Sequence, residues 1–324
     1  MIKQNDLSQN LYLLKNTRAL NLKRYRFIPR IKEEDAAYSF DGLSSNSFSN
    51  KWFLIGKRQS IFKTYDDPLY PEVRKERILN EMLCYRLATK LGINAAPCQP
   101  AKYDEHDGLI SYSFLKDGDK MISGTNILQV LNLLIARGTF ENFAIALPEY
   151  ATKNGVLLDD EIELDLFKMM VFDFLTIQED RHLGNIIFIQ DKNGNLKLAP
   201  LFDNEFAFAI VERMGTGENF DLIKAFYSST RPRPSEVKKT VTNEAYDLFK
   251  ISERDDRFKD FLKEVISFDV EKFFKELDSE ISIDEDYITH CKKCFEYGQE
   301  ALKTACKGIE LADSGIEGDE ERDI

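Results

Sequence analysis

The chain has 324 residues, of which 43% are hydrophobic and 31% are charged, the balance of a globular protein with room for two lobes or two small domains. Its net charge of −12 argues against direct binding of nucleic acid, because phosphate backbones are held by cationic side chains. No segment approaches the ~20 apolar residues of a membrane helix, and the first residues lack the layout of a signal peptide. We therefore expect a protein without a membrane span.

The first part of the chain predicts an arm followed by a β-hairpin. Residues 1–35 form the arm, and the basic stretch 15–32 within it is either a docking segment or simply solvated. The apolar runs KWFLIG and SIFKTY are separated by a short polar turn, which predicts a hairpin over 51–65.

A helix and two more strands should complete a β-rich N-terminal lobe. A leucine-rich stripe, followed by Gly92 in the capping position, predicts a helix over 72–92. The turn DEHDG at 104–108 separates two further apolar runs that predict strands. We assign 36–118 to this lobe.

The rest of the chain has mainly helical periodicity. We assign 119–311 to a helical C-terminal lobe, in which a hairpin over 186–201 is the exception. The end, 312–324, is acidic and poor in core-forming residues, so we expect a disordered tail. The fold class that follows is α+β with two lobes.

The cysteines indicate reduced thiols and a cytoplasmic location, because there are five of them in a long chain. Two stand in the motif HCKKC at His290–Cys294. A metal cluster is one interpretation, but a zinc site needs a fourth ligand. Cys291, Phe295 and Leu302 recur at helical spacing, so we favour a buried helix stripe.

The hairpin over 186–201 brings polar residues together at its open end. Asn193-Gly194 is a strong signal for a two-residue turn, which would place Lys192 opposite Asn195. Counting from that pair brings Asn185 close to Asp203. An amide oxygen and a carboxylate side by side are ligands suited to Mg²⁺.

Asp180 stands five residues before Asn185, where a carboxylate can orient a hydroxyl group. Asp-x-x-x-x-Asn followed by a metal-binding Asp is the layout of kinase-type phosphoryl-transfer sites. The alternative is a surface ion pair between Asp180 and Arg181, with Asp203 capping a turn. Three polar residues in one register favour the functional interpretation.

The N-terminal lobe offers a cation for phosphates. Lys63 alternates with apolar residues in SIFKTY, and Glu81 lies on a half-covered face of the expected helix. A strand lysine held by a helix glutamate is the arrangement found in kinases. The alternatives are a lysine that extends to solvent at a sheet edge and a solvated helix acid. The serine-rich stretch with Gly42 and Ser44, before the first strand, is the candidate phosphate-covering loop.

These residues resemble a known family. DFLTIQEDRHLGNIIFI followed by LKLAPLFD resembles the catalytic core of the HipA family of bacterial serine/threonine kinases, and NEMLCYRLATKLGI resembles its N-lobe helix. The similarity covers about 40–300 and is closest to the short members that lack the N-terminal subdomain. The glycine-poor loop and DNE in place of D-F-G depart from the usual kinase pattern.

The resemblance implies a protein-kinase-like fold that uses ATP and Mg²⁺. Asp180 would be the catalytic base, Asn185 and Asp203 the metal ligands, and Lys63, paired with Glu81, the phosphate contact. The resemblance further implies nucleotide contacts and autophosphorylation sites. The adenine hinge would be Tyr112, Ser113 and Phe114, the nucleotide would also contact His182, and the candidate autophosphorylated serines would be Ser44, Ser45 and Ser47.

Three functions are compatible with these residues. The first is a protein serine/threonine kinase that autophosphorylates and acts as a toxin held by an antitoxin-like protein, in the cytoplasm or, after delivery, in a host cell. The second is a phosphoinositide kinase, because DRHLGN also resembles the catalytic loop of those enzymes. Basic residues would then hold the acidic head group: Lys224, Arg231, Arg233, Lys238 and Lys239. The third is a regulatory module that binds nucleotide without turnover.

Overall fold

The structure is a computed structural model that describes residues 30–31, 50–55, 58–64, 74–103, 106–131, 138–216, 221–228, 231–234, 240–278 and 285–316. The chain forms two compact units. The first unit comprises Met1–Leu115, Pro200–Phe206 and Glu271–Thr289, and the second comprises Lys116–Ala199, Ala207–Val270 and His290–Ile324. After the chain first enters the second unit at Lys116, two later segments, Pro200–Phe206 and Glu271–Thr289, therefore belong to the first unit again. Except for 30–31, the expected arm lies outside the described residues, as does the serine-rich loop with Gly42 and Ser44.

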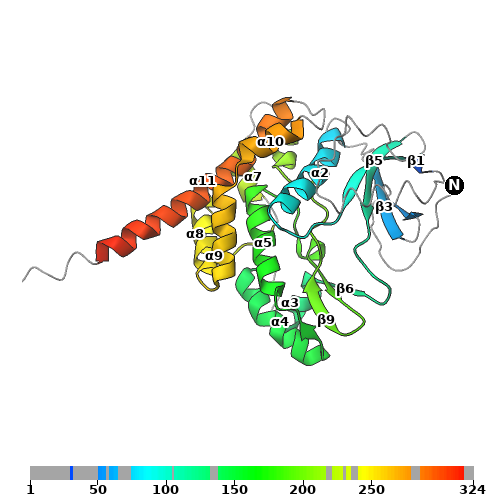
Figure 1. Ribbon diagram of the computed structural model, residues 1–324, viewed down its shortest axis with the longest axis horizontal. Helices are drawn as coiled ribbons and strands as arrows, with labels where there is room; N and C mark the ends of the chain where they lie inside the picture. The colour runs from blue at the N-terminus through cyan, green and yellow to red at the C-terminus, as the bar shows by residue number, and fades with distance from the viewer. Residues whose placement is uncertain are drawn as a thin grey trace, which may run out of the picture. The chain divides into compact units, whose positions relative to one another are not determined.

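A five-stranded sheet in the order β1-β4-β5-β3-β2 forms the first unit's β layer (Figure 1). Its strands are β1 (Arg30–Ile31), β2 (Asn50–Ile55), β3 (Arg58–Thr64), β4 (Cys98–Tyr103) and β5 (His106–Tyr112). β2 and β3 form the hairpin expected from the two apolar runs, with Trp52 opposite Ile61. β5 begins at His106, so part of the stretch expected as a turn belongs to a strand.

Helix α2 (Arg74–Lys90) packs beside this sheet, against β4. Its apolar stripe is buried, as the periodicity predicts: Leu79, Met82, Leu83 and Leu87, with Leu91 just beyond its end. Gly92 ends the helix with φ 62°, a left-handed conformation that a residue without Cβ adopts at little cost. The predicted helix and its cap are confirmed.

The second unit contains a four-stranded sheet rather than an isolated hairpin. Its order is β6-β8-β9-β7, from β6 (Lys120–Ser123), β7 (Leu157–Leu158), β8 (Ile187–Gln190) and β9 (Asn195–Leu198). The sequence analysis missed β6 and β7, because strands this short have no visible alternation and depend on pairing with distant residues.

The expected register of the β8–β9 hairpin is wrong by one residue. Counting from Lys192 opposite Asn195 places Phe188 opposite Ala199, whereas in the structure Phe188 lies opposite Leu198. The loop has three residues, because Asp191 pairs with Asn195 and Gly194 adopts φ 85°. The paired residues of β8 and β9 end before Asn185 is reached. The hairpin register therefore does not bring Asn185 close to Asp203, as counting from the turn predicted.

Buried helix α5 (Ile162–Leu175) runs through the second unit and is apolar on almost every side. Phe167 stacks on Phe258 with ring centres 4.8 Å apart, and Phe140 meets both rings edge-on. The other helices of this unit are α3 (Gly124–Leu128), η3 (Gln129–Leu131), α4 (Phe140–Asn154), η4 (Leu183–Asn185), α6 (Ile210–Thr216), α7 (Leu222–Ser228), α8 (Val241–Ser252) and α9 (Asp256–Ser267). α3 is continued directly by η3, and 132–137 lie outside the described residues.

Two C-terminal helices, α10 (Val270–Asp278) and α11 (Glu285–Ile316), supply residues to both units. Cys291, Cys294, Phe295 and Leu302 are buried along α11, which confirms the helix-stripe interpretation of HCKKC. Because α11 continues to Ile316, the first residues of the expected tail are helical, which corrects that prediction; 317–324 lie outside the described residues.

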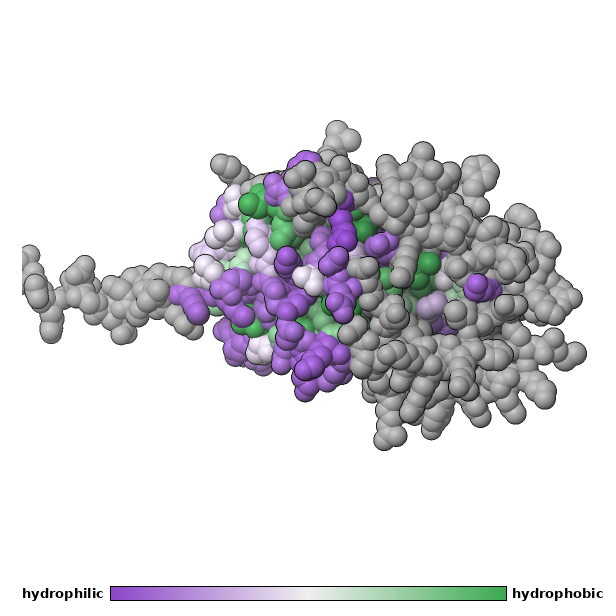
Figure 2. Space-filling model, turned by 90° about the horizontal axis from the view of Figure 1, so that it is seen from above, coloured by the Kyte–Doolittle hydropathy of each residue, from purple (hydrophilic) through white to green (hydrophobic). Residues whose placement is uncertain are grey.

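The described surface on the face shown in Figure 2 is mainly hydrophilic, with hydrophobic side chains in small separate patches. Large apolar side chains with substantial exposure include Leu157 and Ile145. Among the helices that the structure describes, none is long and apolar enough to cross a bilayer.

Candidate functional site

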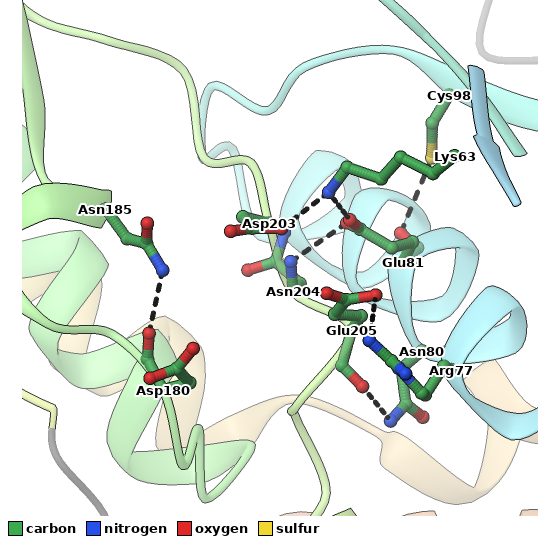
Figure 3. Close-up of polar contacts among 10 residues, drawn as sticks. All are labelled: Lys63, Arg77, Asn80, Glu81, Cys98, Asp180, Asn185, Asp203, Asn204 and Glu205. Atoms are coloured by element: carbon green, nitrogen blue, oxygen red, sulfur yellow. Dashed lines mark hydrogen bonds and ion pairs between the residues drawn. The ribbon is translucent and has the colours of Figure 1, made fainter. Parts of the chain in front are cut away.

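Lys63 on β3 contacts two carboxylates at once (Figure 3). Its Nζ lies 2.9 Å from Oε1 of Glu81 on α2 and 2.5 Å from Oδ1 of Asp203. The side chain of Lys63 is 12% exposed and that of Glu81 is 6% exposed, so these charges interact more strongly than they would in water. The expected ion pair between a strand lysine and a helix glutamate is confirmed.

The second oxygen of Glu81 holds the backbone that carries Asp203. Oε2 accepts a hydrogen bond from the N–H of Asn204 at 2.9 Å. Both oxygens of this buried carboxylate therefore have charged or polar partners, which offsets the cost of its desolvation. Nearby, the Cys98 thiol donates to the Glu81 carbonyl, and burial raises the pKa of Cys98 well above its ordinary value, so the thiol stays protonated.

Residues 200–206 enter this unit as an irregular segment with defined anchors. The N–H of Leu201 donates to the carbonyl of Asn94, and the carbonyl of Leu201 accepts from the N–H of Ala96, each at 2.8 Å. Asp203 then adopts φ 57°, a left-handed conformation that is uncommon for residues with Cβ, although aspartate adopts it more readily than most. The segment is therefore held in a specific, uncommon backbone conformation at its aspartate.

Two further residues of α2 hold the end of this segment (Figure 3). Nδ2 of Asn80 donates to the carbonyl of Glu205 at 3.0 Å, and Oδ1 of Asn80 accepts from the hydroxyl of Tyr287 on α11. Nη2 of Arg77 lies 3.0 Å from Oε2 of Glu205, and the guanidinium lies over the ring of Phe206. Burial raises the pKa of Glu205, although nearby cations including Arg77 oppose this rise.

The residues expected to form an adenine hinge lie at the end of β5. Tyr112 is buried, and its hydroxyl accepts a hydrogen bond from Nε2 of Gln99 at 2.5 Å. The hydroxyl of Ser113 accepts from the backbone N–H two residues further on, and the ring of Phe114 lies 5.6 Å from the ring of Phe202. These contacts fix the path of the chain as it leaves the sheet.

In the second unit, Asp180 and Asn185 belong to one tightly bonded loop. Nδ2 of Asn185 donates to the carbonyl of Asp180 at 2.9 Å, which is the polar contact drawn for this pair in Figure 3. Oε1 of Gln178 accepts from the N–H of Asp180 at 3.1 Å, and Nδ1 of His182 accepts from the N–H of Gly184 at 3.0 Å. Hydrogen bonds within the loop therefore involve the residues before Asp180 and the residues after it in the sequence.

Arg181 anchors this loop to α5 through a buried ion pair. Its Nε lies 3.0 Å from Oδ2 of Asp173, and its Nη2 lies 3.2 Å from Oδ1. Both side chains are 1% exposed, so the alternative of a surface ion pair between Asp180 and Arg181 is wrong. Burial raises the pKa of Asp173, although Arg181 opposes the rise.

Glu179 joins the same loop to the segment that precedes α6. It is buried, and its Oε2 accepts from the N–H of Val211 at 2.6 Å. Burial raises the pKa of Glu179 to about 7, against the effect of the N–H groups that it accepts. The N–H of Phe208 donates to the carbonyl of Thr176, and the N–H of Ala209 donates to the carbonyl of Ile177. Ile177 and Phe208 have φ 44° and 58°, and Nε2 of His290 bonds to the carbonyl of Phe208 at 2.7 Å. The loop is therefore held by α5, by the N–H of Val211 and by the backbone near Phe208. The positive φ values of Ile177 and Phe208 are the local strain that accompanies these contacts.

Three of the basic residues that the phosphoinositide-kinase interpretation requires, Lys224, Arg231 and Arg233, form ion pairs within this unit. Arg231 and Arg233 are buried and both contact Glu244, at 3.3 and 3.5 Å. Lys224 lies 2.8 Å from a carboxylate of α6, and residues 238–239 lie outside the described residues. The two arginines are structural, so the expected basic surface for a head group is not formed by them.

Each unit, taken by itself, carries an oxygen donor suited to a hard cation such as Mg²⁺. Because Nδ2 of Asn185 is committed to the carbonyl of Asp180, its Oδ1 is the atom left on the other side of the amide. Asp203 offers a carboxylate that is 29% exposed. Oxygen ligands of this kind, few in number and supplemented by phosphate and water, are those that Mg²⁺ uses in proteins.

Sequence reasoning found the charged residues but missed those that hold them. Arg77, Asn80 and Glu81 share one face of α2, because they stand at positions i, i+3 and i+4. That spacing was visible in the sequence, but only Glu81 was selected. Glu179 and Asp173 carried no such signal, because their partners are set by tertiary packing.

Comparisons with known proteins give the family of this chain. The family model of the HipA-like C-terminal domain matches residues 49–267. The chain belongs to this family. A search of curated proteins found no match.

Solved structures that resemble the HipA-like chain include the following two. One is the crystal structure of a Helicobacter pylori proinflammatory kinase, CtkA, with a TM-score of 0.55 and 13% identity over 88% of this chain and 100% of that one. The other is a chain of the Shewanella oneidensis MR-1 toxin–antitoxin complex of HipA and HipB with operator DNA, with a TM-score of 0.46 and 15% identity over 81% of this chain and 66% of that one. The similarity to CtkA shows a shared α+β fold of the HipA kinase type.

Proposed function

We propose that this chain is an ATP- and Mg²⁺-dependent kinase that phosphorylates serine or threonine residues of proteins. The observation that supports it best is the shared contact of Lys63 with Glu81 and Asp203. These residues stand far apart in the sequence, and a lysine–glutamate pair beside a metal-binding aspartate is what phosphoryl transfer in kinases requires.

The roles of the residues that bind nucleotide and metal follow from their chemistry. Lys63 neutralises phosphate oxygens of ATP, and Glu81 keeps its ammonium group in place. Asp203 and Asn185 hold Mg²⁺, which when bound neutralises charge on the β- and γ-phosphates. Tyr112 to Phe114 contact the adenine base, and His182 contacts the nucleotide.

Asp180 is proposed as the group that accepts the proton of the acceptor hydroxyl. Gln178 and Arg181 support this role, because one bonds to the N–H of Asp180 and the other fixes the loop to α5. A base held in this way needs little reorganisation when it orients the hydroxyl. Autophosphorylation of a loop serine such as Ser44, a toxin role, an antitoxin-like partner and a cytoplasmic location remain predictions from the family resemblance.

The test is phosphate transfer from radiolabelled ATP with Mg²⁺, followed by mass spectrometry of the chain and of an added protein substrate. Asp180→Asn and Lys63→Met should lower transfer by at least about 10²-fold, which is the scale of a lost proton-transfer or electrostatic contribution. Asp160→Asn is the matched control, because it makes the same chemical change at an exposed residue of the second unit.

Three results would oppose the proposal. Undiminished transfer in Asp180→Asn contradicts the assignment of the base. Transfer to phosphoinositide vesicles but not to protein supports the lipid-kinase alternative instead. Nucleotide binding without any transfer in the unaltered chain supports a regulatory module.

A further inference from the structure

The segment that carries Asp203 is attached to α2 by more than Glu81. Asn80, at 0% exposure, donates one hydrogen bond to the carbonyl of Glu205 and accepts another from Tyr287. Its two amide atoms therefore have different obligatory partners, and the side chain cannot rotate without breaking both bonds.

Tyr287 belongs to the first turn of α11, which is distant in sequence from both partners. It is 1% exposed, so its hydroxyl cannot exchange Asn80 for water. Removing the hydroxyl takes this hydrogen bond from a buried amide oxygen, a change that is costly where water cannot replace the donor. The start of α11 thereby determines the orientation of the Asn80 amide.

The carbonyl that Asn80 holds is two residues beyond Asp203, whose φ is 57°. A positive φ is a minority conformation even for aspartate, so contacts on either side of it help to select this conformation. Leu201 is fixed before it by two backbone bonds, and Glu205 after it by Asn80 and Arg77. Without the later anchor, the backbone at Asp203 can return to a favoured conformation and turn its carboxylate.

We propose that Asn80 and Tyr287 are positioning residues for Asp203: a relay from α11 through Asn80 to Glu205 sets the direction of the metal-binding carboxylate. The inference rests on the proposed function for the role of Asp203, but the relay itself is a property of the chain alone. Its consequence is that metal binding depends on a helix that contributes no ligand.

The test uses two variants of the full chain. Tyr287→Phe removes one oxygen and keeps the ring packing. Asn80→Asp keeps an acceptor for Tyr287 but replaces the donor that faces the Glu205 carbonyl. Ala88→Gly is the control, because it weakens α2 at a buried position that makes no polar contact with the segment.

The first readout is hydrogen exchange without nucleotide, which needs no activity. Both variants should speed exchange of the Asn204 amide, while the Leu201 amide, bonded to Asn94, stays protected. Exchange at Asn204 that equals that of the unaltered chain in both variants overturns the inference. So does an equal acceleration in Ala88→Gly, because the effect would then be general loosening of the helix.

The second readout is binding of Mn²⁺, as a spectroscopic probe for the metal, together with a non-hydrolysable ATP analogue. Loss of an outer contact of a metal ligand typically weakens binding by about 10–100-fold, and we expect that range for both variants. Affinity for the metal-free analogue should stay unchanged, because the pair of Lys63 with Glu81 is intact. Unchanged Mn²⁺ affinity in both variants overturns the inference, whereas absence of metal–nucleotide binding in the unaltered chain contradicts the proposed function and leaves the relay to the exchange measurement.

Discussion

Replacing Arg181 by methionine isolates the contribution of the buried ion pair that anchors the loop of Asp180. The change removes both nitrogen contacts to Asp173, which is fully buried. A buried carboxylate that loses its partner costs about 3–5 kcal/mol. At about 2–4 °C per kcal/mol for a unit of this size, the unfolding midpoint should fall by roughly 6–20 °C.

The pH dependence of this variant has a definite sign. The folded-state pKa of Asp173 is already above its ordinary value of 3.8 because of burial, and losing Arg181 raises it further. Protonation therefore favours the folded state, and the deficit of Arg181→Met relative to the unaltered chain should shrink as the pH falls through the raised pKa.

The assay is thermal and urea unfolding of Arg181→Met and of the double variant with Asp173→Leu. Replacing both members of a buried pair by apolar residues of similar size is often neutral or stabilising, so the double variant should regain most of the loss. A single-variant loss below about 1 kcal/mol, or a double variant less stable than Arg181→Met, would refute the reasoning.

Three further predictions concern single groups. Glu179→Gln should flatten the dependence of stability on pH: with a folded pKa of about 7 against 4.5, the carboxyl stabilises the fold fully below pH 4.5 and loses about 3 kcal/mol of that contribution as the pH rises to 7. His290→Gln should have the opposite effect, because a folded pKa of about 4 against 6.5 costs the unaltered chain about 3 kcal/mol as the pH falls from 6.5 to 4. Gly194→Ala should lower the free energy of unfolding in urea by about 1–2 kcal/mol, because a residue with Cβ is strained at φ 85°. The added methyl group itself meets no atom within 4 Å, so the backbone conformation is the source of the loss.

The two pH effects overlap and oppose each other, so urea unfolding must be measured for each variant against the unaltered chain at pH 4 to 8. A constant difference across that range contradicts the assignment for Glu179 or His290. For the hairpin turn, Lys192→Ala is the control, and an equal loss in both variants means that the left-handed conformation of Gly194 contributes nothing specific.

Local patterns predicted the features that depend on neighbouring residues. Alternation in SIFKTY and the 3.6-residue period of α2 were enough to select Lys63 and Glu81, whose pairing the structure contains. The leucine stripe of α2 and the cap at Gly92 were predictable for the same reason.

The hairpin register was missed because side-chain bonding competed with the turn signal. Oδ1 of Asp191 accepts from the N–H groups of both Asn193 and Asn195, which stabilises a three-residue loop over the two-residue turn that Asn-Gly favours. Because the turn sets the register, predicting a two-residue turn shifted the predicted partner of every residue in β8 by one position.

The residues that hold the functional groups depend on distant segments. Tyr287 meets Asn80 only after α11 has folded against α2, and Asp173 meets Arg181 across a turn at the end of α5. No pattern within a short stretch of sequence carries such information.

The division of the chain has a consequence for its synthesis. The chain passes between its units at 115/116, 199/200, 206/207, 270/271 and 289/290. Domains made first usually fold first as the chain leaves the ribosome. Here the first unit cannot be complete until Thr289 has emerged, so Asp203 acquires its support through Asn80 and Tyr287 only after 116–199 and 207–270 of the second unit have been made.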